Sequence, residues 1–289
     1  MKPAAPLRLV VTGSSSGIGH ALTLRLLQAG HEVWGLARSE QGALVAGFPD
    51  QFHAIRCDVS DWDQVERAAR ESAAAALDGL ITCAGIQGEI GRTVTADPRR
   101  WAATVRTNLD GTFHVIRAFW PALLRSSRRA KVICFSGGGS TKARPQFSAY
   151  GAAKTAIVRL VETIAAEEAA ARVDVNAIAP GAIWTQMTEE VLALGPQVVG
   201  QSDFQAAQRQ QRDDPTPMNR ALDLVEWLLS PASDGISGRL ISAPWDPWRT
   251  LDRHAAELAK SDIYTLRRIT PEERGQRWTG LERTTDAPG

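Results

Sequence analysis

Cysteine is scarce in this sequence, which has only Cys57, Cys83 and Cys134 among its 289 residues. Each lies in or at the end of an apolar run, and their odd number shows none of the paired spacing of disulfide frameworks or zinc sites. The pattern argues against a disulfide framework and against a zinc site. It favours reduced, buried thiols in a cytoplasmic protein.

An excess of charge of one sign is also absent, since 33 Lys and Arg residues face 32 Asp and Glu residues. A balanced chain has no bulk attraction to nucleic acid or to an anionic membrane. The first residues, MKPAAPLRLVVTG, hold neither a long apolar segment nor a cleavage pattern, which argues against a secretion signal and a membrane span. The partner class that remains is a small molecule.

Short apolar runs rich in Val, Ile and Leu alternate with longer amphipathic stretches, from LRLVVTG at 7–13 to GRLISA at 238–243. Apolar strands separated by crossover helices indicate a parallel sheet covered on both faces. A chain of 289 residues with 44% hydrophobic content can bury one sizeable core. We therefore expect a single doubly wound α/β domain over residues 1–243, followed by a C-terminal extension over residues 244–289.

The segment TGSSSGIG, residues 12–19, follows the first apolar run and opens the first amphipathic stretch. Glycines at 13, 17 and 19 permit a tight turn, close approach of backbone amides to a pyrophosphate, and close packing of helix on sheet. Such triplets also occur in ordinary turns. The position between a strand and a helix favours a dinucleotide site.

Tyr150 and Lys154 are four residues apart, so on a helix both project from one face. An unperturbed phenol titrates near pH 10, and an ammonium one turn away stabilises its phenolate. The isolated pattern is frequent in solvated helices. Its place after a strand end and a glycine run favours an acid-base pair.

Several further motifs occur in a fixed order: Gly-x-x-x-Gly-x-Gly at 13–19, CDVSD at 57–61, CAG at 83–85, RTNLDG around Asn108, Tyr150-x-x-x-Lys154, and APGAIWT at 179–185. Together they resemble the short-chain dehydrogenases and reductases, in their compact single-domain branch, over roughly residues 7–243. The resemblance implies a Rossmann-type fold, a nicotinamide cofactor, and a small carbonyl or alcohol substrate. It also implies a homodimer or homotetramer formed through the helices that contain Asn108 and Tyr150.

The resemblance further implies which residues bind the cofactor. They are Gly13, Ser15, Ser16, Gly17, Ile18, Gly19, Arg38, Asp58, Val59, Ala84, Gly85, Tyr150, Lys154, Pro180, Gly181, Ile183 and Thr185. Asp58 would reach the adenine, although it could instead cap a helix that starts near Asp61. Arg38 stands near the end of the second strand, where an acidic residue usually receives ribose hydroxyls; a guanidinium there favours NADP over NAD, unless it is merely solvated.

The implied catalytic residues are Tyr150 as proton donor and acceptor, Lys154, Asn108 and a serine. In the family, a second serine thirteen residues before the tyrosine polarises the substrate carbonyl, but that position is Gly137. Ser136, Ser140 or a backbone amide of the glycine run is left for this role, and we favour Ser136 because it is nearest the strand end. The alternative is a cofactor-binding protein that has lost catalysis.

Two segments have open interpretations, and no metal-ligand cluster is evident in the sequence. The polar residues 186–220 form either a helical flap over a site or a solvated connection. In the tail, Trp245 and Trp248 are expected to pack back on the domain or on a neighbouring subunit near the substrate mouth. The alternative is a tail that only covers the sheet edge, and the last residues, 283–289, are expected to be mobile. The identity of the substrate is not encoded in any of these patterns.

Overall fold

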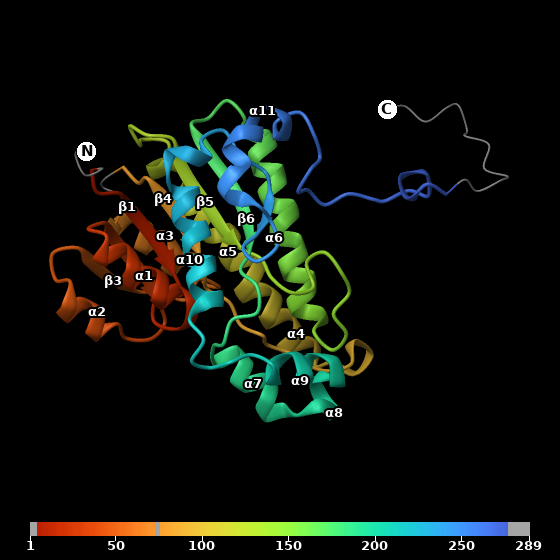
Figure 1. Cartoon of the computed structure of the whole chain (residues 1–289). Coiled ribbons are helices and arrows are strands. Elements are labelled where there is room, and N and C mark those ends of the chain that lie inside the picture. Colours follow the sequence, from red (N-terminus) through yellow and green to blue (C-terminus); the bar gives the residue numbers. More distant parts are fainter. Residues whose placement is uncertain (1–4, 73–75, 277–289) are drawn as a thin grey trace.

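Seven parallel strands form one sheet in the order β3-β2-β1-β4-β5-β6-β7 (Figure 1). The computed structural model describes residues 5–72 and 76–276. The strands are β1 Arg8–Thr12, β2 Glu32–Ala37, β3 Phe52–Arg56, β4 Gly79–Thr82, β5 Ala130–Phe135, β6 Val173–Ala179 and β7 Leu240–Ser242. This sheet, covered by helices, confirms the expected doubly wound α/β fold.

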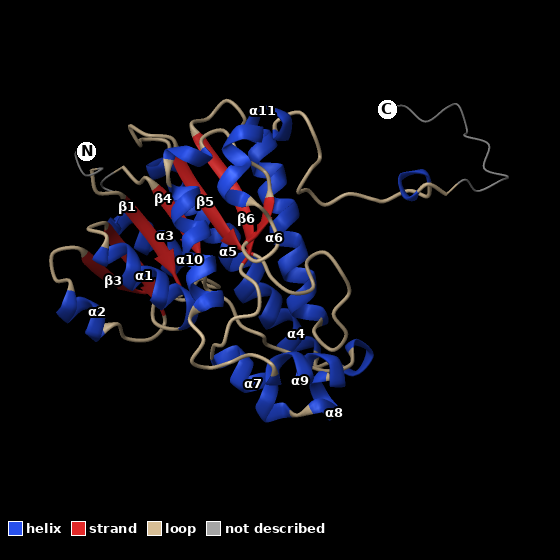
Figure 2. Ribbon diagram, viewed as in Figure 1, coloured by secondary structure: helices blue, strands red, loops and turns tan. Residues whose placement is uncertain are grey.

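Helices cover both faces of the sheet (Figure 2). The α-helices are α1 Gly17–Gln28, α2 Gly42–Gly47, α3 Trp62–Ser72, α4 Pro98–Val105, α5 Gly111–Leu123, α6 Ser148–Glu167, α7 Gln186–Leu194, α8 Pro196–Val199, α9 Gln201–Gln208, α10 Thr216–Leu229 and α11 Ala255–Leu258. The short 3-10 turns are η1 Thr93–Thr95, η3 Pro231–Ser233, η4 Trp248–His254 and η5 Glu272–Arg274. In the described part of the chain, no helix combines the length and the apolar character needed to cross a bilayer.

The strands divide their side chains between two cores because successive residues point to opposite faces. On β1, Leu9 and Val11 join the core under α1 and α10, whereas Val10 joins the core under α3, α5 and α6. On β5, Ile133 and Cys134 divide in the same way. Near-continuous apolar strands are required when both faces are buried, as the sequence pattern indicated.

The order of the strands reverses at β1, which pairs with β2 on one side and with β4 on the other. In open α/β sheets, ligands bind beyond the carboxyl ends of the strands at such a switch point. The loops that follow β1, β3, β4 and β6 at the carboxyl ends of these strands each carry one of the sequence motifs, and the loop after β5 leads into α6 with Tyr150 and Lys154. The topology therefore gathers the motifs at one edge of the sheet.

Asn108 lies in a π-helical turn, Arg106–Asp110, that joins α4 to α5 without a break. The helix continues through Asp110 and Gly111 into α5. A Cβ added to Gly111 would lie 2.6 Å from Cγ2 of Val59, so glycine is needed there for close packing. The wide turn, rather than an interruption, provides the local irregularity of this helix.

Residues 186–208 form the helices α7, α8 and α9, which Figure 1 shows as a group beyond the carboxyl ends of the strands. Val191, Val199 and Ala207 from these helices pack in one cluster with Phe147 and Tyr150 at the start of α6. The helical-flap interpretation is therefore supported over a solvated connection. We call α7–α9 the flap.

The tail after β7 folds back along the sheet edge. The amide of Leu240 in β7 donates a hydrogen bond to the carbonyl of Tyr264 (2.8 Å), and Arg239 donates to the carbonyls of Leu258, Ser261 and Ile263. Residues 258–264 thus cover β7. This matches the alternative in which the tail covers the edge of the sheet. Unpaired strand edges attract other chains, so the cover also protects the edge.

The two tail tryptophans, Trp245 and Trp248, differ in their exposure to solvent. Trp248 is 3% exposed and packs against Trp227 of α10, with ring centroids 6.0 Å apart. Trp245 is 85% exposed, so the expectation that it packs back on its own domain was wrong. The turn between β7 and η4 leaves its side chain directed at solvent, and packing on a second subunit stays a prediction. The expected mobile residues 283–289 lie outside the described part of the chain.

Candidate active site

The loop after β1 is locked against the loop after β4. Gly13 has φ +70°, and a Cβ there would lie 2.9 Å from the amide nitrogen of Ala84. A Cβ on Gly19 would lie 2.3 Å from the carbonyl oxygen of Gly13. The amide of Ala84 in turn donates to Oγ1 of Thr12 (3.0 Å). Two of the three motif glycines therefore serve close backbone packing.

The third motif glycine lies at an open surface. Gly17 (φ +54°) begins α1, and a Cβ there would meet only the Thr185 side chain, at 3.7 Å. The preceding Ser16 makes no side-chain cap, so the first amides of α1 stay available to an anion. Ser15 is half-buried, Ser16 is exposed, and Ile18 packs on the core. This cradle fits a pyrophosphate.

Arg38 lies at the end of β2 beside the cradle. It is exposed, and within the described residues no hydrogen bond or ion pair engages its guanidinium. The hydroxyl of Ser14, in the loop after β1, already donates a hydrogen bond to the side chain of Gln41 (2.5 Å). Arg38 is therefore available to meet an added phosphate.

Asp58 follows β3, and its Oδ1 accepts hydrogen bonds from the amide and hydroxyl of Ser60 (2.9 and 2.7 Å). The alternative that Asp58 caps the next helix is wrong, because Asp61 accepts from the amide of Gln64 instead. Val59 is buried beneath α5, where its carbonyl contacts His114 Nδ1 (3.0 Å). The adenine contact of Asp58 stays a prediction.

Tyr150 and Lys154 lie on the first turns of α6, 9% and 4% exposed. Lys154 Nζ donates to the carbonyl of Phe135 at the end of β5 (2.8 Å) and lies 5.6 Å from the Tyr150 ring centroid. Burial lowers the pKa of Lys154 to about 8, against the effect of the nearby thiols Cys83 and Cys134. Burial raises the pKa of Tyr150, and the Arg144 guanidinium opposes that rise. The structure thus brings the two residues together at one strand end.

Asn108 holds the π-helical turn against the loop after β4. Its Nδ2 donates to the carbonyls of Ile86 and Thr104 (3.0 and 2.9 Å), and its main-chain carbonyl accepts from Thr112 (2.8 Å). A Cβ on Gly85 would lie 2.6 Å from Asn108 Oδ1 and 3.6 Å from Lys154 Nζ. Asn108 and Gly85 therefore lie next to Lys154, as the expected set requires.

Ser136 makes a buried hydrogen bond just beyond the end of β5. Its buried hydroxyl donates to the main-chain carbonyl of Lys154 (3.1 Å), which occupies its single proton. The role of Ser136 in polarising a substrate carbonyl stays a prediction. The hydroxyl ties β5 to α6.

The motif after β6 closes the site opposite α1. Gly181 (φ +91°) passes under Pro244, whose Cγ would lie 3.1 Å from an added Cβ. Ile183 is buried, and its carbonyl accepts from Thr188 (3.2 Å). Thr185 caps α7 and faces Gly17 across the cradle. Pro180, half-buried, begins this turn at the end of β6.

Sequence reasoning missed Arg144, which lies beside Tyr150, and Asp203, which pairs with Arg144. Arg144 Nε donates to Asp203 Oδ1 of α9 (2.7 Å), and its Cζ lies 5.8 Å from the Tyr150 ring centroid. A cation between the glycine run and the tyrosine was visible in the sequence. Its carboxylate partner, 59 residues away, was not.

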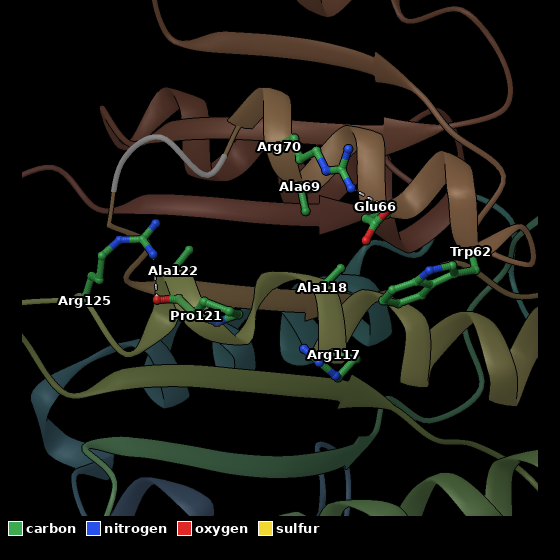
Figure 3. A pocket seen from close by; sticks show the side chains of 9 residues that line it. All are labelled: Trp62, Glu66, Ala69, Arg70, Arg117, Ala118, Pro121, Ala122 and Arg125. Atoms are coloured by element: carbon green, nitrogen blue, oxygen red, sulfur yellow. Dashed lines mark hydrogen bonds and ion pairs between the residues drawn. The ribbon is translucent and has the colours of Figure 1, made fainter.

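Two open grooves lie outside this site. One, of about 400 Å³, runs between α3 and α5 (Figure 3). The other, of about 590 Å³, lies between α6 and the tail near Leu266. Neither is lined by a residue of the expected cofactor or catalytic set. Across residues 5–72 and 76–276, no group of three His, Cys, Asp or Glu side chains is placed to hold a metal ion.

Comparison with known proteins agrees with this geometry. A sequence model described as short chain dehydrogenase matches residues 8–193. The short chain dehydrogenase mpl6 of Monascus purpureus is 32% identical over 249 residues, which are 82% of this chain and 80% of that protein. Galactitol 2-dehydrogenase (L-tagatose-forming) of Cereibacter sphaeroides is 36% identical over 189 residues, 62% of this chain and 72% of the relative. The structure of a short chain dehydrogenase of Shigella flexneri, complexed with NADP, shares the fold with a TM-score of 0.69 at 23% identity, over 82% of this chain and 96% of that one.

Proposed function

The chain belongs to the short-chain dehydrogenase family, and on that premise we propose that it is an NADP-preferring oxidoreductase that interconverts a secondary alcohol and a ketone. The observation that carries the proposal is the buried pair Tyr150 and Lys154, on one face of α6 at the carboxyl end of β5. The bound cofactor would donate or accept the hydride.

Tyr150 handles the proton of the reaction. In the reductive direction the carbonyl carbon gains the hydride, the π electron pair of C=O moves to oxygen, and that oxygen takes the proton of the phenol. The phenolate left behind recovers a proton from solvent. Lys154, held by the Phe135 carbonyl, places its positive charge near the phenolate and stabilises it.

The cofactor preference rests on Arg38. Its guanidinium is exposed at the end of β2 and, in the described part of the chain, makes no hydrogen bond or ion pair; a carboxylate at this point would repel a ribose phosphate. The Shigella flexneri relative was solved with NADP, which is consistent with this preference. The rest of the proposed cofactor set lines the same edge: Gly13, Gly17, Gly19, Gly85 and Thr185.

The substrate class rests on chemistry rather than on a shaped pocket. Galactitol 2-dehydrogenase, by its name, oxidises a secondary alcohol of a polyol to a ketose. This supports a secondary alcohol and ketone as the reacting pair. We further propose a cytoplasmic homodimer or homotetramer, since the free cysteines suit a reducing compartment and Phe113 of α5 is exposed.

The test is a redox assay of the purified chain. NADPH and NADH absorbance is followed with chemically diverse ketones, and NADP and NAD reduction with the matching alcohols. Turnover with NADPH or NADP of a ketone–alcohol pair is the expected result. Tight NADPH binding without turnover of any pair would favour the non-catalytic alternative, for which the glycine at position 137 is the motive.

A further inference from the structure

The glycine run after β5 is filled by two side chains from the segment that follows it. A Cβ on Gly137 would lie 2.9 Å from the phenol oxygen of Tyr150. A Cβ on Gly138 would lie 3.8 Å from Cδ and Nη1 of Arg144, and one on Gly139 would lie 3.3 Å from Arg144 Cβ. The run therefore lies directly against Tyr150 and Arg144.

Arg144 is held in place on three sides. Its Nε donates to Asp203 of the flap (2.7 Å), and its Cζ lies 3.7 Å from the centroid of the buried Phe147 ring. Gly138 lies along its remaining side. The side chain is 21% exposed, and within the described residues neither Nη atom has a hydrogen-bond partner. Two nitrogens that carry donor N–H groups are thus fixed beside Tyr150 and left free.

The favoured serine donor is engaged elsewhere in this structure. Position 137 has no side chain, and the Ser136 hydroxyl is engaged with the Lys154 carbonyl. A reduction nevertheless develops negative charge on the carbonyl oxygen, and a fixed donor at that point is usually a large contribution to catalysis. A charged donor contributes more than a hydroxyl.

We propose that Arg144 is a further catalytic residue, whose Nη donors bind the substrate carbonyl oxygen in place of the serine hydroxyl that position 137 lacks. The inference rests on the proposed function, because it assigns a role in that same reaction. Asp203 acts as a positioning residue that orients the guanidinium. Since Asp203 lies on α9, the donor is in place only when the flap is packed against α6.

The geometry also explains the glycines. Side chains at 137 and 139 would meet Tyr150 and Arg144 at distances shorter than ordinary contact, so the loop is glycine where these two groups approach. The glycine at position 137 and the arginine at position 144 are then parts of the same site, because the absent side chain leaves room for the groups that replace it. A protein that had lost catalysis would not require this close packing of the glycine run against Tyr150 and Arg144.

The experiment compares the wild type with Arg144→Ala, Arg144→Gln and Lys142→Ala on a ketone that the wild type reduces. Lys142 is the matched control, an exposed cation of the same loop with no contact to Tyr150 within the described residues. Loss of a single oxyanion donor predicts a fall in kcat of about 100-fold for both Arg144 variants. NADPH affinity, measured by fluorescence, should be unchanged, and Lys142→Ala should keep the wild-type kcat.

Chemical rescue separates donor function from structure. Guanidinium chloride at low millimolar concentration should restore part of the kcat of Arg144→Ala, whereas sodium chloride at equal ionic strength should not. If Arg144→Ala is not folded by circular dichroism, Arg144→Gln decides the kcat comparison. Asp203→Asn should lower kcat less than Arg144→Ala does. Asp203→Glu, which keeps the carboxylate, should have a kcat closer to that of the wild type than Asp203→Asn has.

The outcomes distinguish the two proposals. A wild type that reduces a ketone, with Arg144→Ala and Arg144→Gln at the same kcat, overturns the inference and leaves the proposed function standing. A loss of kcat that guanidinium and sodium chloride affect equally also overturns the donor role. A wild type that turns over no ketone–alcohol pair overturns the proposed function, and this inference with it.

Discussion

The phenol oxygen of Tyr150 lies 2.9 Å from the point where a side chain on Gly137 would begin. Real Cβ contacts are not this short, so the tyrosine occupies space that any larger residue at 137 would need. The ring is buried under Phe147 and the flap, which leaves it little freedom to withdraw. Tyr150 itself therefore occupies the space that a serine side chain at position 137 would need.

Gly137→Ala and Gly137→Ser are therefore expected to lower activity rather than to restore it. The added Cβ must displace Tyr150 or the loop, at an overpacking cost of about 1–3 kcal/mol in the free energy of unfolding. Gly138→Ala is the matched control, because its Cβ would make only ordinary contact at 3.8 Å. Kinetics and urea unfolding of the three variants check this. A Gly137→Ser variant that is faster than the wild type and equally stable would contradict the packing account.

Arg38→Asp is expected to weaken NADPH binding and to spare or improve NADH binding. Loss of a charge-assisted contact predicts roughly a tenfold or larger rise in the NADPH dissociation constant. Arg99→Asp on α4 is the control for a general charge effect, since it is also exposed. Fluorescence titration of both cofactors measures the change. Equal affinity of the wild-type protein for NADPH and NADH would contradict the assigned role.

Lys154 predicts a pH dependence of stability. Its pKa is lowered by burial from 10.5 to about 8, so between these values the unfolded chain binds more protons than the folded one. Stability contributed by this group therefore rises with pH from about 8 to 10.5. The full gain is of order 3 kcal/mol. Lys154→Met removes the titration.

The measurement is the free energy of unfolding of the wild type and of Lys154→Met at pH 7.5 and at pH 9.5, which lie on either side of the folded pKa of about 8. The difference between the two proteins should shift in favour of the wild type at the higher pH. A difference that does not change with pH would mean that the folded pKa of Lys154 is not depressed.

The tail is expected to stabilise the domain through Trp248 and not through Trp245. Trp248→Ala removes a buried ring that packs on Trp227, with an expected loss of about 3–5 kcal/mol in the free energy of unfolding. Trp245→Ala is the matched control and should leave the monomer's stability unchanged. Thermal and urea unfolding decide between them. Equal effects of the two substitutions would contradict the described packing.

The fold and the main chemistry could be read from the sequence because their signals are local. Apolar strands with crossover helices predict the sheet, and Tyr150 with Lys154 share a face of one helix whatever its surroundings. The strand-end rule then places their motifs at one edge. Each of these steps needs only neighbouring residues and a general topology.

Most of the features that the sequence did not predict depend on residues that are distant in the chain. Whether the Ser136 hydroxyl is free depends on the carbonyl of Lys154, which lies across from it on α6. The role of Arg144 depends on Asp203, and the exposure of Trp245 depends on the turn after β7. Only the contact with Val59 shows that Gly111 serves close packing. Such contacts are long-range and leave no periodic trace.

Tyr150 carries the central claim, and the chain offers a clean control because its only other tyrosine is Tyr264. On a ketone that the wild type reduces, NADPH consumption is compared for the wild type, Tyr150→Phe and Tyr264→Phe. Loss of the proton donor predicts a fall in kcat of about 10²- to 10⁴-fold for Tyr150→Phe, with NADPH affinity unchanged and Tyr264→Phe equal to the wild type. A Tyr150→Phe protein that keeps the wild-type kcat would contradict the account.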